Sequence, residues 1–389
     1  MTLRVLQLSR SMIDGGFDYQ REITRAFDGK GVDVTTVFQR GVLTAERQRE
    51  YNGRVVCLDA RRRRVYKNPW VAALRLLALG RRAAFDVAIC HHYTPALIVN
   101  RLQRLWNIPR MFFIVHDFDY FDAKDEQGAR RNRFVTRSLD PRCRLVAVSH
   151  AIRRNVLNSM PGLDPDRCIV IHNAIDMARL ERERLGRAEA RRQLGLDPDA
   201  FIFGTVGRLV SFKAHGELID TFAKAQAEMP AAQLVIVGRG PLKQELAARI
   251  SGYGLQDRVR LTDFVPDASR LMSAFDCFVL PSHNEPFGLV LLEAMACRLP
   301  VIANNTGAVP EVLPYREGIV DVTDTGGFAA KLLEFYRCPE ARRRQLGDLG
   351  YDHAEREFSL DQYRARYRAL GFGDLPDEPS SMPGDLEKA

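Results

Sequence analysis

The sequence lacks several features that would place it in common classes of protein. No apolar run approaches the roughly 18 residues that a helix needs to span a bilayer. The seven cysteines are odd in number, scattered and without a C-x-x-C pair. This pattern indicates reduced thiols in a cytoplasmic protein, not a disulfide framework or a zinc site. Because the chain opens on a strand-like run at residues 3–8, we also expect no signal peptide.

Motifs of three enzyme classes are missing as well. The absence of a G-x-x-x-x-G-K-[ST] loop argues against a P-loop NTPase, and the absence of G-x-G-x-x-G after the first strand argues against NAD binding. Without G-x-S-x-G, a serine hydrolase is disfavoured. Asp117 and Asp119 form a D-x-D that could hold a metal, but this spacing recurs at residues 164–166 and 197–199. We therefore expect no metal and no other cofactor.

Charge is distributed unevenly along the 389 residues. Residues 1–190 hold 34 Lys and Arg against 21 Asp and Glu, whereas residues 191–389 hold 23 against 28. The basic half includes Arg61–Arg64 and continues with apolar-interleaved arginines to residue 82. Such a surface suits an anionic membrane or a phosphorylated acceptor, and nucleic acid could use the same charge. Only eight of the 57 basic residues are lysine, so a compositional preference for arginine explains the run equally well.

Short apolar runs alternate with amphipathic helical patterns in two successive stretches. The first stretch predicts strands at 3–8, 33–38, 54–58, 86–90, 111–115, 144–148 and 168–171, and helices at 16–29, 70–83, 95–105, 127–138 and 150–159. After the polar segment 181–198, the second predicts strands at 201–206, 233–237, 258–261, 277–280, 300–303 and 318–320, and helices at 214–228, 241–252, 268–274, 288–297 and 326–336. The fold class is therefore α/β, with two doubly wound, Rossmann-like domains facing each other across a cleft.

The domain boundaries follow from this alternation. We expect the first domain over residues 1–190 and the second over 191–355. A last helical pattern runs through residues 340–370, and its part from 356 to 370 is expected to pack back on the first domain as a C-terminal helix. Residues 371–389, rich in Gly, Pro, Ser and acidic side chains, are expected to form a disordered tail.

The segment 281–313 carries most of the functional information. An apolar run ends at Pro281, a loop with Glu285 follows, and Pro286-Phe287-Gly288 opens an amphipathic helix that contains Glu293. Free N–H groups at a helix start attract phosphate, and carboxylates can bind sugar hydroxyls. The segment therefore predicts a nucleotide-sugar site.

Other residues suited to binding a ligand follow predicted strands, and ligands of parallel sheets bind beyond the carboxyl ends of the strands. They are Gly15 and Gly16, His116, Arg208 with Lys213, Gly238, and Asn304–Gly307. Each also has a structural interpretation: the glycines as tight turns, the two cations as exposed surface, and His116 as a hydrogen-bonded histidine at a strand end. Glu311 could simply begin a helix. Their shared placement is what favours a site.

These motifs resemble the family 4 retaining glycosyltransferases of the GT-B fold, of the type that builds bacterial lipopolysaccharide cores and cell-surface glycans. The resemblance covers most of residues 1–370. Glu285 and Glu293 match the E-x7-E signature in the setting E-P-F-G-L-x-x-x-E-A-M-A. The other matching segments are Val206–Leu209 with Lys213, Val237–Pro241, His172–Asp176, Gly15-Gly16 and Val115–Asp117. Ala174, Ala214 and Arg298 stand where the family usually has glycine, and Arg298 should alter the exit of its helix.

The resemblance implies a role for each matched residue. Arg208 and Lys213 would neutralise the diphosphate leaving group, Glu285 would contact the donor sugar, and His116 would face the sugar on the acceptor side. The other donor contacts would be Glu293 to the ribose, Phe264 and Val265 to the base, the backbone N–H groups of Phe287, Gly288 and Leu289 to the sugar or β-phosphate, and Gly15, Gly16 and Gly238 near the phosphates. It also implies retention by a front-face mechanism in preference to a covalent intermediate on Glu285.

We therefore expect a cytoplasmic glycosyltransferase that moves a sugar from an NDP-sugar, of UDP-hexose type, to a glycan or lipid-linked acceptor in cell-envelope polysaccharide or lipopolysaccharide synthesis. The first domain would bind acceptor and the second the donor; an anionic membrane face is a further candidate partner, and nucleic acid is not expected. Two alternatives stay open. A non-hydrolysing NDP-sugar epimerase would act without acceptor, and a non-catalytic sugar-nucleotide or nucleic-acid binding protein would show no turnover.

Overall fold

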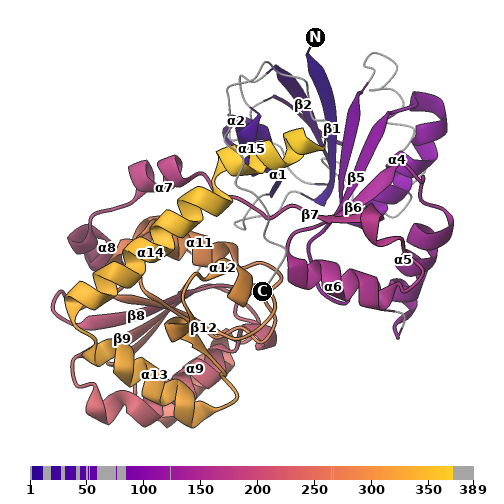
Figure 1. Ribbon diagram of the computed structural model, residues 1–389. Helices are drawn as coiled ribbons and strands as arrows, with labels where there is room; N and C mark the ends of the chain where they lie inside the picture. Colours follow the sequence, from indigo (N-terminus) through magenta and orange to yellow (C-terminus); the bar gives the residue numbers. More distant parts are fainter. Residues whose placement is uncertain are drawn as a thin grey trace.

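Two parallel sheets covered by helices form the protein, one in each of two units (Figure 1). The computed structural model describes residues 2–11, 19–27, 31–40, 44–49, 51, 53–58, 76, 85–122, 124–263, 265 and 267–370. Among these residues no helix is long and apolar enough to cross a membrane. The α/β class and the paired Rossmann-like sheets predicted from the sequence are confirmed.

The first sheet has seven strands in the order β3-β2-β1-β4-β5-β6-β7. Its strands are β1 Leu3–Ser11, β2 Val32–Arg40, β3 Arg54–Cys57, β4 Val87–His91, β5 Arg110–Val115, β6 Cys143–Ala147 and β7 Cys168–Val170. The helices of this unit are α1 Tyr19–Ala26, α2 Ala45–Arg49, α4 Tyr93–Trp106, α5 Glu126–Arg137 and α6 His150–Ser159. Every residue of β4 is buried, as expected of a parallel strand covered on both faces.

The second sheet has six strands in the order β10-β9-β8-β11-β12-β13. Its strands are β8 Phe201–Val206, β9 Ala232–Val237, β10 Val259–Thr262, β11 Cys277–Leu280, β12 Val301–Asn304 and β13 Ile319–Val320. The helices are α9 His215–Ala225, α10 Lys243–Gly252, α11 Leu289–Ala296, α12 Val309–Val312 and α13 Thr325–Arg337. In each sheet the order reverses beside the first strand, so the crevice for a ligand is expected beyond β1 and β4 and beyond β8 and β11.

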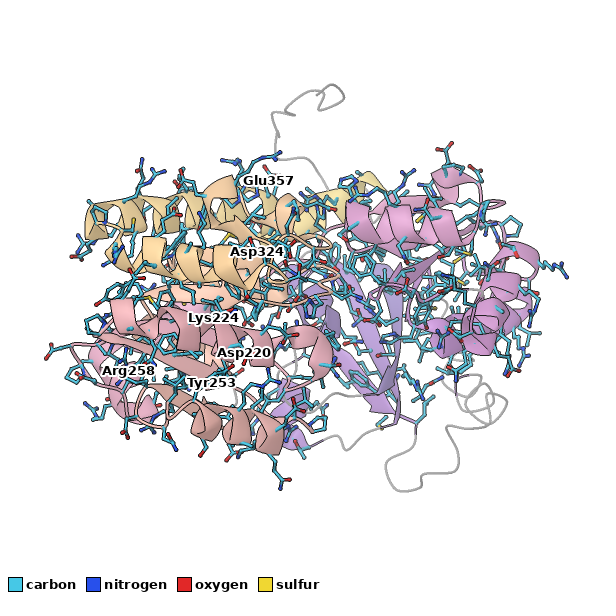
Figure 2. The ribbon with its side chains drawn as sticks, turned by 90° about the horizontal axis from the view of Figure 1, so that it is seen from below. Asp220, Lys224, Tyr253, Arg258, Asp324 and Glu357 are labelled. Atoms are coloured by element: carbon cyan, nitrogen blue, oxygen red, sulfur yellow. The ribbon has the colours of Figure 1, made fainter. Side chains whose placement is uncertain are left out.

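The helices of the second unit form distinct layers. Helix α9 contacts α10 and α13, whereas α11 contacts α14, which spans Glu340–Phe358. Lys224 of α9 lies between Asp220 on the same helix and Asp324 before α13 (Figure 2). Its Nζ donates a hydrogen bond to Thr325 Oγ1 at 2.5 Å, and Asp220 pairs with Arg249 of α10 at 2.7 Å. The two contacts connect α9 to α13 and to α10.

The chain crosses between the units twice. It passes from β7 to β8 through α7 (Met177–Glu183) and α8 (Arg187–Leu194). It returns at Ser359, where α14 ends and α15 (Leu360–Ala369) begins with the Ser359 hydroxyl as its N-cap. Helix α15 packs on α1: Tyr367 lies edge-on against Phe27 and against Phe112 of β5, with ring centroids 6.1 and 6.4 Å away. The last helix therefore completes the first unit's core.

The structure differs from the predicted elements in three segments of the described residues. The polar segment 181–198 contains α8 and the end of α7, and the predicted helix 268–274 is the 3-10 helix η5 (Ala268–Ala274). The single pattern 340–370 divides at Ser359, because the extended ψ of 162° at that residue breaks the helix. The predicted helix 70–83 lies outside the described residues except for Leu76, and the predicted tail 371–389 lies wholly outside them.

Two departures from the glycines of the resembled family sit in the left-handed region. Ala214 has φ of 53° and Arg298 has φ of 54°. A non-glycine residue there costs about 1–2 kcal/mol. At Arg298 the side chain offsets part of this cost, since its guanidinium lies 3.7 Å from the Tyr351 ring centroid and bonds Asp348 Oδ1 at 2.7 Å. The exit of α11 thus keeps the left-handed conformation that a glycine would favour, and the expected change at this exit is wrong.

Close packing of β8 against Phe275 predicts the effect of one small substitution. A Cβ at Gly204 would lie 2.2 Å from the Phe275 ring, so Gly204→Ala should lower the free energy of unfolding by about 1–3 kcal/mol. Gly252→Ala at the end of α10 is the matched control, because its Cβ would meet nothing within 4 Å and should stabilise by about 0.5–1 kcal/mol. Urea unfolding followed by circular dichroism measures both. Equal midpoints for the two variants would contradict the packing argument.

Candidate active site

A buried ion pair lies beyond the carboxyl ends of β8 and β11. Lys213 ends the 3-10 turn η3 (Ser211–Lys213) after β8, and Glu285 lies in the loop after β11. Lys213 Nζ lies 2.7 Å from Glu285 Oε2, and Glu285 is only 6% exposed. The two loops are held together by the backbone, since His283 N donates to Phe212 O at 2.8 Å. Two residues that are 72 positions apart in the sequence therefore meet at the predicted edge of the sheet.

Arg208 extends this positive charge towards solvent. Its guanidinium and the Lys213 ammonium approach the ring of Phe212 with centroid distances of 5.6 and 5.7 Å. Arg208 is exposed, so it remains available to a ligand at the same loop. Gly238, after β9, packs directly against this turn: a Cβ there would lie 1.9 Å from Gly207 O. The close approach of the two turns accounts for the glycine.

Helix α11 begins beside the ion pair. Gly288 caps it with φ of 89°, in the left-handed region that glycine enters without strain, and a Cβ there would lie 3.3 Å from Glu285 Cγ. The first N–H groups of a helix have no partner within the helix, so those after Gly288 form a positive end next to Glu285. The Phe287 side chain instead points into the core, 5.9 Å from the His172 ring and 5.6 Å from the Phe358 ring.

Glu293 lies in the second turn of α11 and is partly buried. Burial raises the pKa of its carboxyl to about 7, against the opposing effect of the positive charge on Arg179 of α7. Asp267, before η5, also raises this pKa, and Arg21 and Glu22 of α1 act on it as well, so the group senses charges from both units. Its protonation state thus changes within the physiological pH range.

Three polar side chains of the first sheet form a buried hydrogen-bonded chain. Gln7 of β1 donates through Nε2 to Gln20 O at 3.0 Å and to Thr36 Oγ1 at 3.1 Å. Since a backbone carbonyl can only accept, the orientation of the Gln7 amide is fixed, and its Oε1 faces His91 Nε2 at 3.4 Å. His91 Nδ1 lies 3.0 Å from Nε2 of His116, which follows β5.

The chain determines which nitrogen of each ring carries the proton. Burial lowers the pKa of His91 to about 3, and it lowers the pKa of His116 well below its usual value, so both rings are neutral near pH 7. His91 must donate from Nε2 to Gln7 and therefore accepts at Nδ1. His116 then donates from Nε2, which leaves its Nδ1 as the accepting nitrogen. Gln7 thus fixes the tautomer of His116 through His91.

The strand-end region around His116 carries further polar groups. His92 has φ of 74° and its ring lies 5.4 Å from the His116 ring. Tyr120 Oη accepts a hydrogen bond from Tyr93 N at 2.5 Å, and burial raises its pKa to about 12. Arg131 of α5 lies over the Tyr120 ring at 4.3 Å. In the part of the chain that the structure describes, no group of three metal-ligating side chains is found.

Glu311 of α12 connects the two units. Its carboxylate accepts hydrogen bonds from His150 N at 2.8 Å and Ala151 N at 2.6 Å, which are the first N–H groups of α6. Burial alone would raise the pKa of Glu311, but the close approach of His172 Nε2, 3.5 Å from Oε2, and the hydrogen bonds from these two N–H groups hold it below its usual value. Nearby, Ser149 Oγ donates to Pro286 O at 2.7 Å. The loop that carries Glu285 is thus fixed against the first unit.

Comparison with known proteins identifies the family. Residues 186–351 match the family described as "Glycosyl transferases group 1", and residues 13–179 match "Glycosyltransferase Family 4". Over 344 residues the chain is 31% identical to a D-inositol 3-phosphate glycosyltransferase of Geodermatophilus obscurus, which covers 81% of this chain and 73% of that protein. The chain belongs to glycosyltransferase family 4.

Other relatives of this family 4 member match over shorter segments. An α-maltose-1-phosphate synthase of Mycolicibacterium smegmatis is 33% identical over 231 residues, which are 55% of this chain and 59% of that protein. Among solved structures, HepE of Anabaena in complex with UDP and glucose has a TM-score of 0.78 at 18% identity, covering 95% of this chain and 100% of that one. A glycosyltransferase from Rickettsia africae has a TM-score of 0.80 at 16% identity, covering 95% and 97%. The GT-B fold is thereby confirmed.

The structure places the predicted site residues of this family 4 member in three groups. Arg208, Lys213, Glu285 and the start of α11 come together, Glu293 lies among interunit charges, and His116 belongs to the first sheet. The first and third groups come close to each other at Gly307. A Cβ on this glycine would lie 2.1 Å from Glu285 O and 3.1 Å from the ring of Phe118, which is two residues after His116. Gly15, Gly16 and Phe264 lie outside the described residues, and Val265 is partly buried and packs against the core.

Sequence reasoning missed the partners of His116. Gln7 and His91 sit inside apolar strand patterns, where one polar residue carries no signal of its own. The pair His91-His92 at the end of a predicted strand was the available indication, by the same rule that selected His116. The Glu311 contact was missed because its partners are backbone groups of a helix 160 residues away.

The hydrogen-bonded chain predicts one tautomer for His116. Long-range ¹H–¹⁵N spectra of the histidine-labelled protein should show the proton on Nε2 and a non-protonated Nδ1. His91→Phe removes the nitrogen that accepts from His116 and should allow the other tautomer of His116 to appear. His353→Phe, on α14, is the control, because it does not touch the Gln7–His91–His116 hydrogen bonds. A wild-type His116 protonated at Nδ1 would contradict the assignment.

Proposed function

We propose that this family 4 member is a retaining glycosyltransferase that moves a hexose from a UDP-sugar to a glycan or lipid-linked acceptor. The observation that carries the proposal is the Lys213–Glu285 pair at 2.7 Å beside the start of α11. A cation, a carboxylate and a helix N-terminus at one strand edge can bind a diphosphate and a sugar side by side. The UDP complex of the Anabaena structure supports the choice of nucleotide.

The chain's own residues provide for leaving-group departure. When UDP leaves, negative charge develops on its β-phosphate, and Arg208, Lys213 and the N–H groups at the start of α11 stabilise that charge. Lys213 is already held in place by Glu285, so little reorganisation is needed when the donor binds. Glu293 accepts hydrogen bonds from the ribose hydroxyls.

The state of Glu285 supports front-face retention. A covalent mechanism needs a carboxylate that is free to attack the anomeric carbon. Glu285 is buried and bound to Lys213, and its loop is tied to Ser149 of the first unit through Pro286. We therefore assign Glu285 to binding the donor sugar, and the acceptor hydroxyl to attack from the leaving-group side. His116, with an accepting Nδ1, contacts a sugar hydroxyl from the acceptor side.

The acceptor and pathway are inferred from charge and from relatives. The basic first half suits an anionic acceptor. Relatives are named for inositol 3-phosphate and for malate, which are both anionic. Together with the similarity to the lipopolysaccharide outer core galactosyltransferase WaaB (TM-score 0.67, 13% identity), this supports a role in cell-envelope glycan synthesis at the cytoplasmic face of a membrane.

A donor panel without acceptor tests the proposal. UDP-, GDP- and ADP-hexoses are incubated with the protein, and both nucleotide release and the sugar configuration are measured. We expect slow release of UDP, and we expect the remaining UDP-sugar not to be converted into an epimer. Conversion of one UDP-sugar into its epimer would instead indicate an epimerase, and the absence of any binding or release with the whole panel would refute the transferase.

Lys213 gives a sharp mutational test. Lys213→Ala should slow transfer by about 10²–10³-fold, because the β-phosphate loses a pre-placed positive charge in the transition state. Lys213→Arg keeps the charge and should recover part of the rate, and Lys224→Ala on the outer surface of α9 is the control for loss of a lysine. Wild-type turnover in Lys213→Ala, measured with saturating donor, would rule out the assigned role.

Glu293 predicts a pH-dependent donor affinity. Its pKa of about 7 means that the carboxylate, which accepts from both ribose hydroxyls, replaces the neutral acid as pH rises through neutrality. Affinity for UDP-glucose, whose diphosphate does not titrate there, should therefore increase between about pH 6 and pH 8. The raised pKa also affects stability. The contribution of this carboxyl to the free energy of unfolding is fully present below pH 4.5, its usual pKa, and is lost as the pH rises to about 7.

The control for this prediction is Glu293→Gln, which cannot ionise. Calorimetric titration of the variant with UDP-glucose should give weaker binding and a flat pH dependence. The same pH slope in the variant and the wild type would exclude Glu293 as its origin.

A further inference from the structure

A groove lined by arginines lies on the first unit between α4 and α5, separate from the strand edge described above. It has a volume of about 870 Å³. The residues that line it are Tyr93, Leu97, Asn100, Arg101, Arg130, Arg133, Phe134, Arg137 and Ser138. Four of these nine described residues are arginine and none is acidic.

The two helices hold the groove in a defined shape. The Tyr93 ring lies edge-on to Phe134 with centroids 5.2 Å apart, and Asn100 Nδ2 donates to Ser138 O at 2.9 Å. Both helices lie on the same outer side of the first sheet (Figure 1). The two rings form an apolar floor, and the Asn100–Ser138 hydrogen bond fixes a polar end. Arginine side chains border this floor, and neither of the two contacts involves a guanidinium group.

The arginines of α5 divide by face. Arg131 bonds Tyr120 O and Gln127 Oε1 and stacks on the Tyr120 ring. Arg130, Arg133 and Arg137 share the other face at helical spacing, are exposed, and form no ion pair with any carboxylate of the described residues. Asp140, just beyond the groove, is already paired with Arg142 at 2.9 Å. Three like charges on one face repel each other unless an anion lies between them.

We propose that the α4–α5 groove is a binding site for a phosphate-bearing anion, separate from the donor site. Guanidinium groups bind phosphate oxygens through paired hydrogen bonds, and several of them around one concave surface favour a doubly charged or clustered phosphate over a single carboxylate. The groove begins at Tyr93, next to His92 and its contact with His116. A phosphate of the acceptor or of an anionic lipid headgroup can therefore be held while the acceptor sugar reaches the strand edge.

A triple substitution with a matched control tests the site. Arg130→Gln, Arg133→Gln and Arg137→Gln together lower the net charge by three, and so do Arg192→Gln, Arg344→Gln and Arg356→Gln on exposed positions of α8 and α14. Binding of inorganic pyrophosphate is measured in the presence of saturating UDP, and binding of phosphatidylglycerol vesicles is measured against phosphatidylcholine vesicles. Circular dichroism verifies that both triple variants are folded.

The groove variant should lose about tenfold or more in affinity for at least one phosphate probe, and the control variant should bind as the wild type does. Loss confined to vesicles assigns the site to a lipid headgroup, and loss confined to pyrophosphate assigns it to a soluble phosphate group. Three outcomes would overturn the proposal. They are an equal loss of probe affinity in the groove and control variants, a wild-type affinity for duplex DNA equal to that for the phosphate probes, and no wild-type binding of either probe. Since no turnover is measured, these results are independent of whether the donor panel supports sugar transfer.

Discussion

The arrangement of the two units depends on the carboxylate of Glu311, which caps α6 of the other unit. A helix start leaves N–H groups without partners, and a negatively charged acceptor satisfies both their hydrogen bonds and the helix dipole. Here that acceptor comes from the second sheet, and His172 supports it. A second hydrogen bond at the same end of α6, from Ser149 Oγ to Pro286 O, fixes the loop of Glu285. A change at the interface between the units would therefore also change the geometry of the site.

Much of the fold could be predicted because parallel strands buried on both faces read as short apolar runs. All thirteen strands of the described residues coincide with a predicted run to within a few positions. The failures have two causes. Helices α7 and α8 are short and mostly polar, so their few buried residues, such as Leu180 and Leu194, give no clear period. The division at Ser359 depends on contacts with Ile175 of the distant crossover segment.

The placement of Lys213 and Glu285 beyond the strand ends could be predicted from the sequence, but their pairing could not. Lys213 and Glu285 were each expected to face a ligand, and in the protein they face each other, because a buried carboxylate without a partner is unfavourable. Phe287 was expected to offer its backbone N–H group, and nothing in the sequence indicated that its side chain packs in the core against Phe358. The tautomer of His116 depends on Gln7, whose importance follows only from three-dimensional hydrogen bonding.

The packing of α15 against α1 has a consequence for how the chain is made on the ribosome. The first sheet is synthesised early, but the ring of Tyr367 that covers Phe27 and Phe112 emerges only after the second unit is complete. Until then the nascent first unit exposes an aromatic surface that invites chaperone binding or aggregation. Final closure of the first unit's core thus waits until α15 has been synthesised, so this unit matures only after the second.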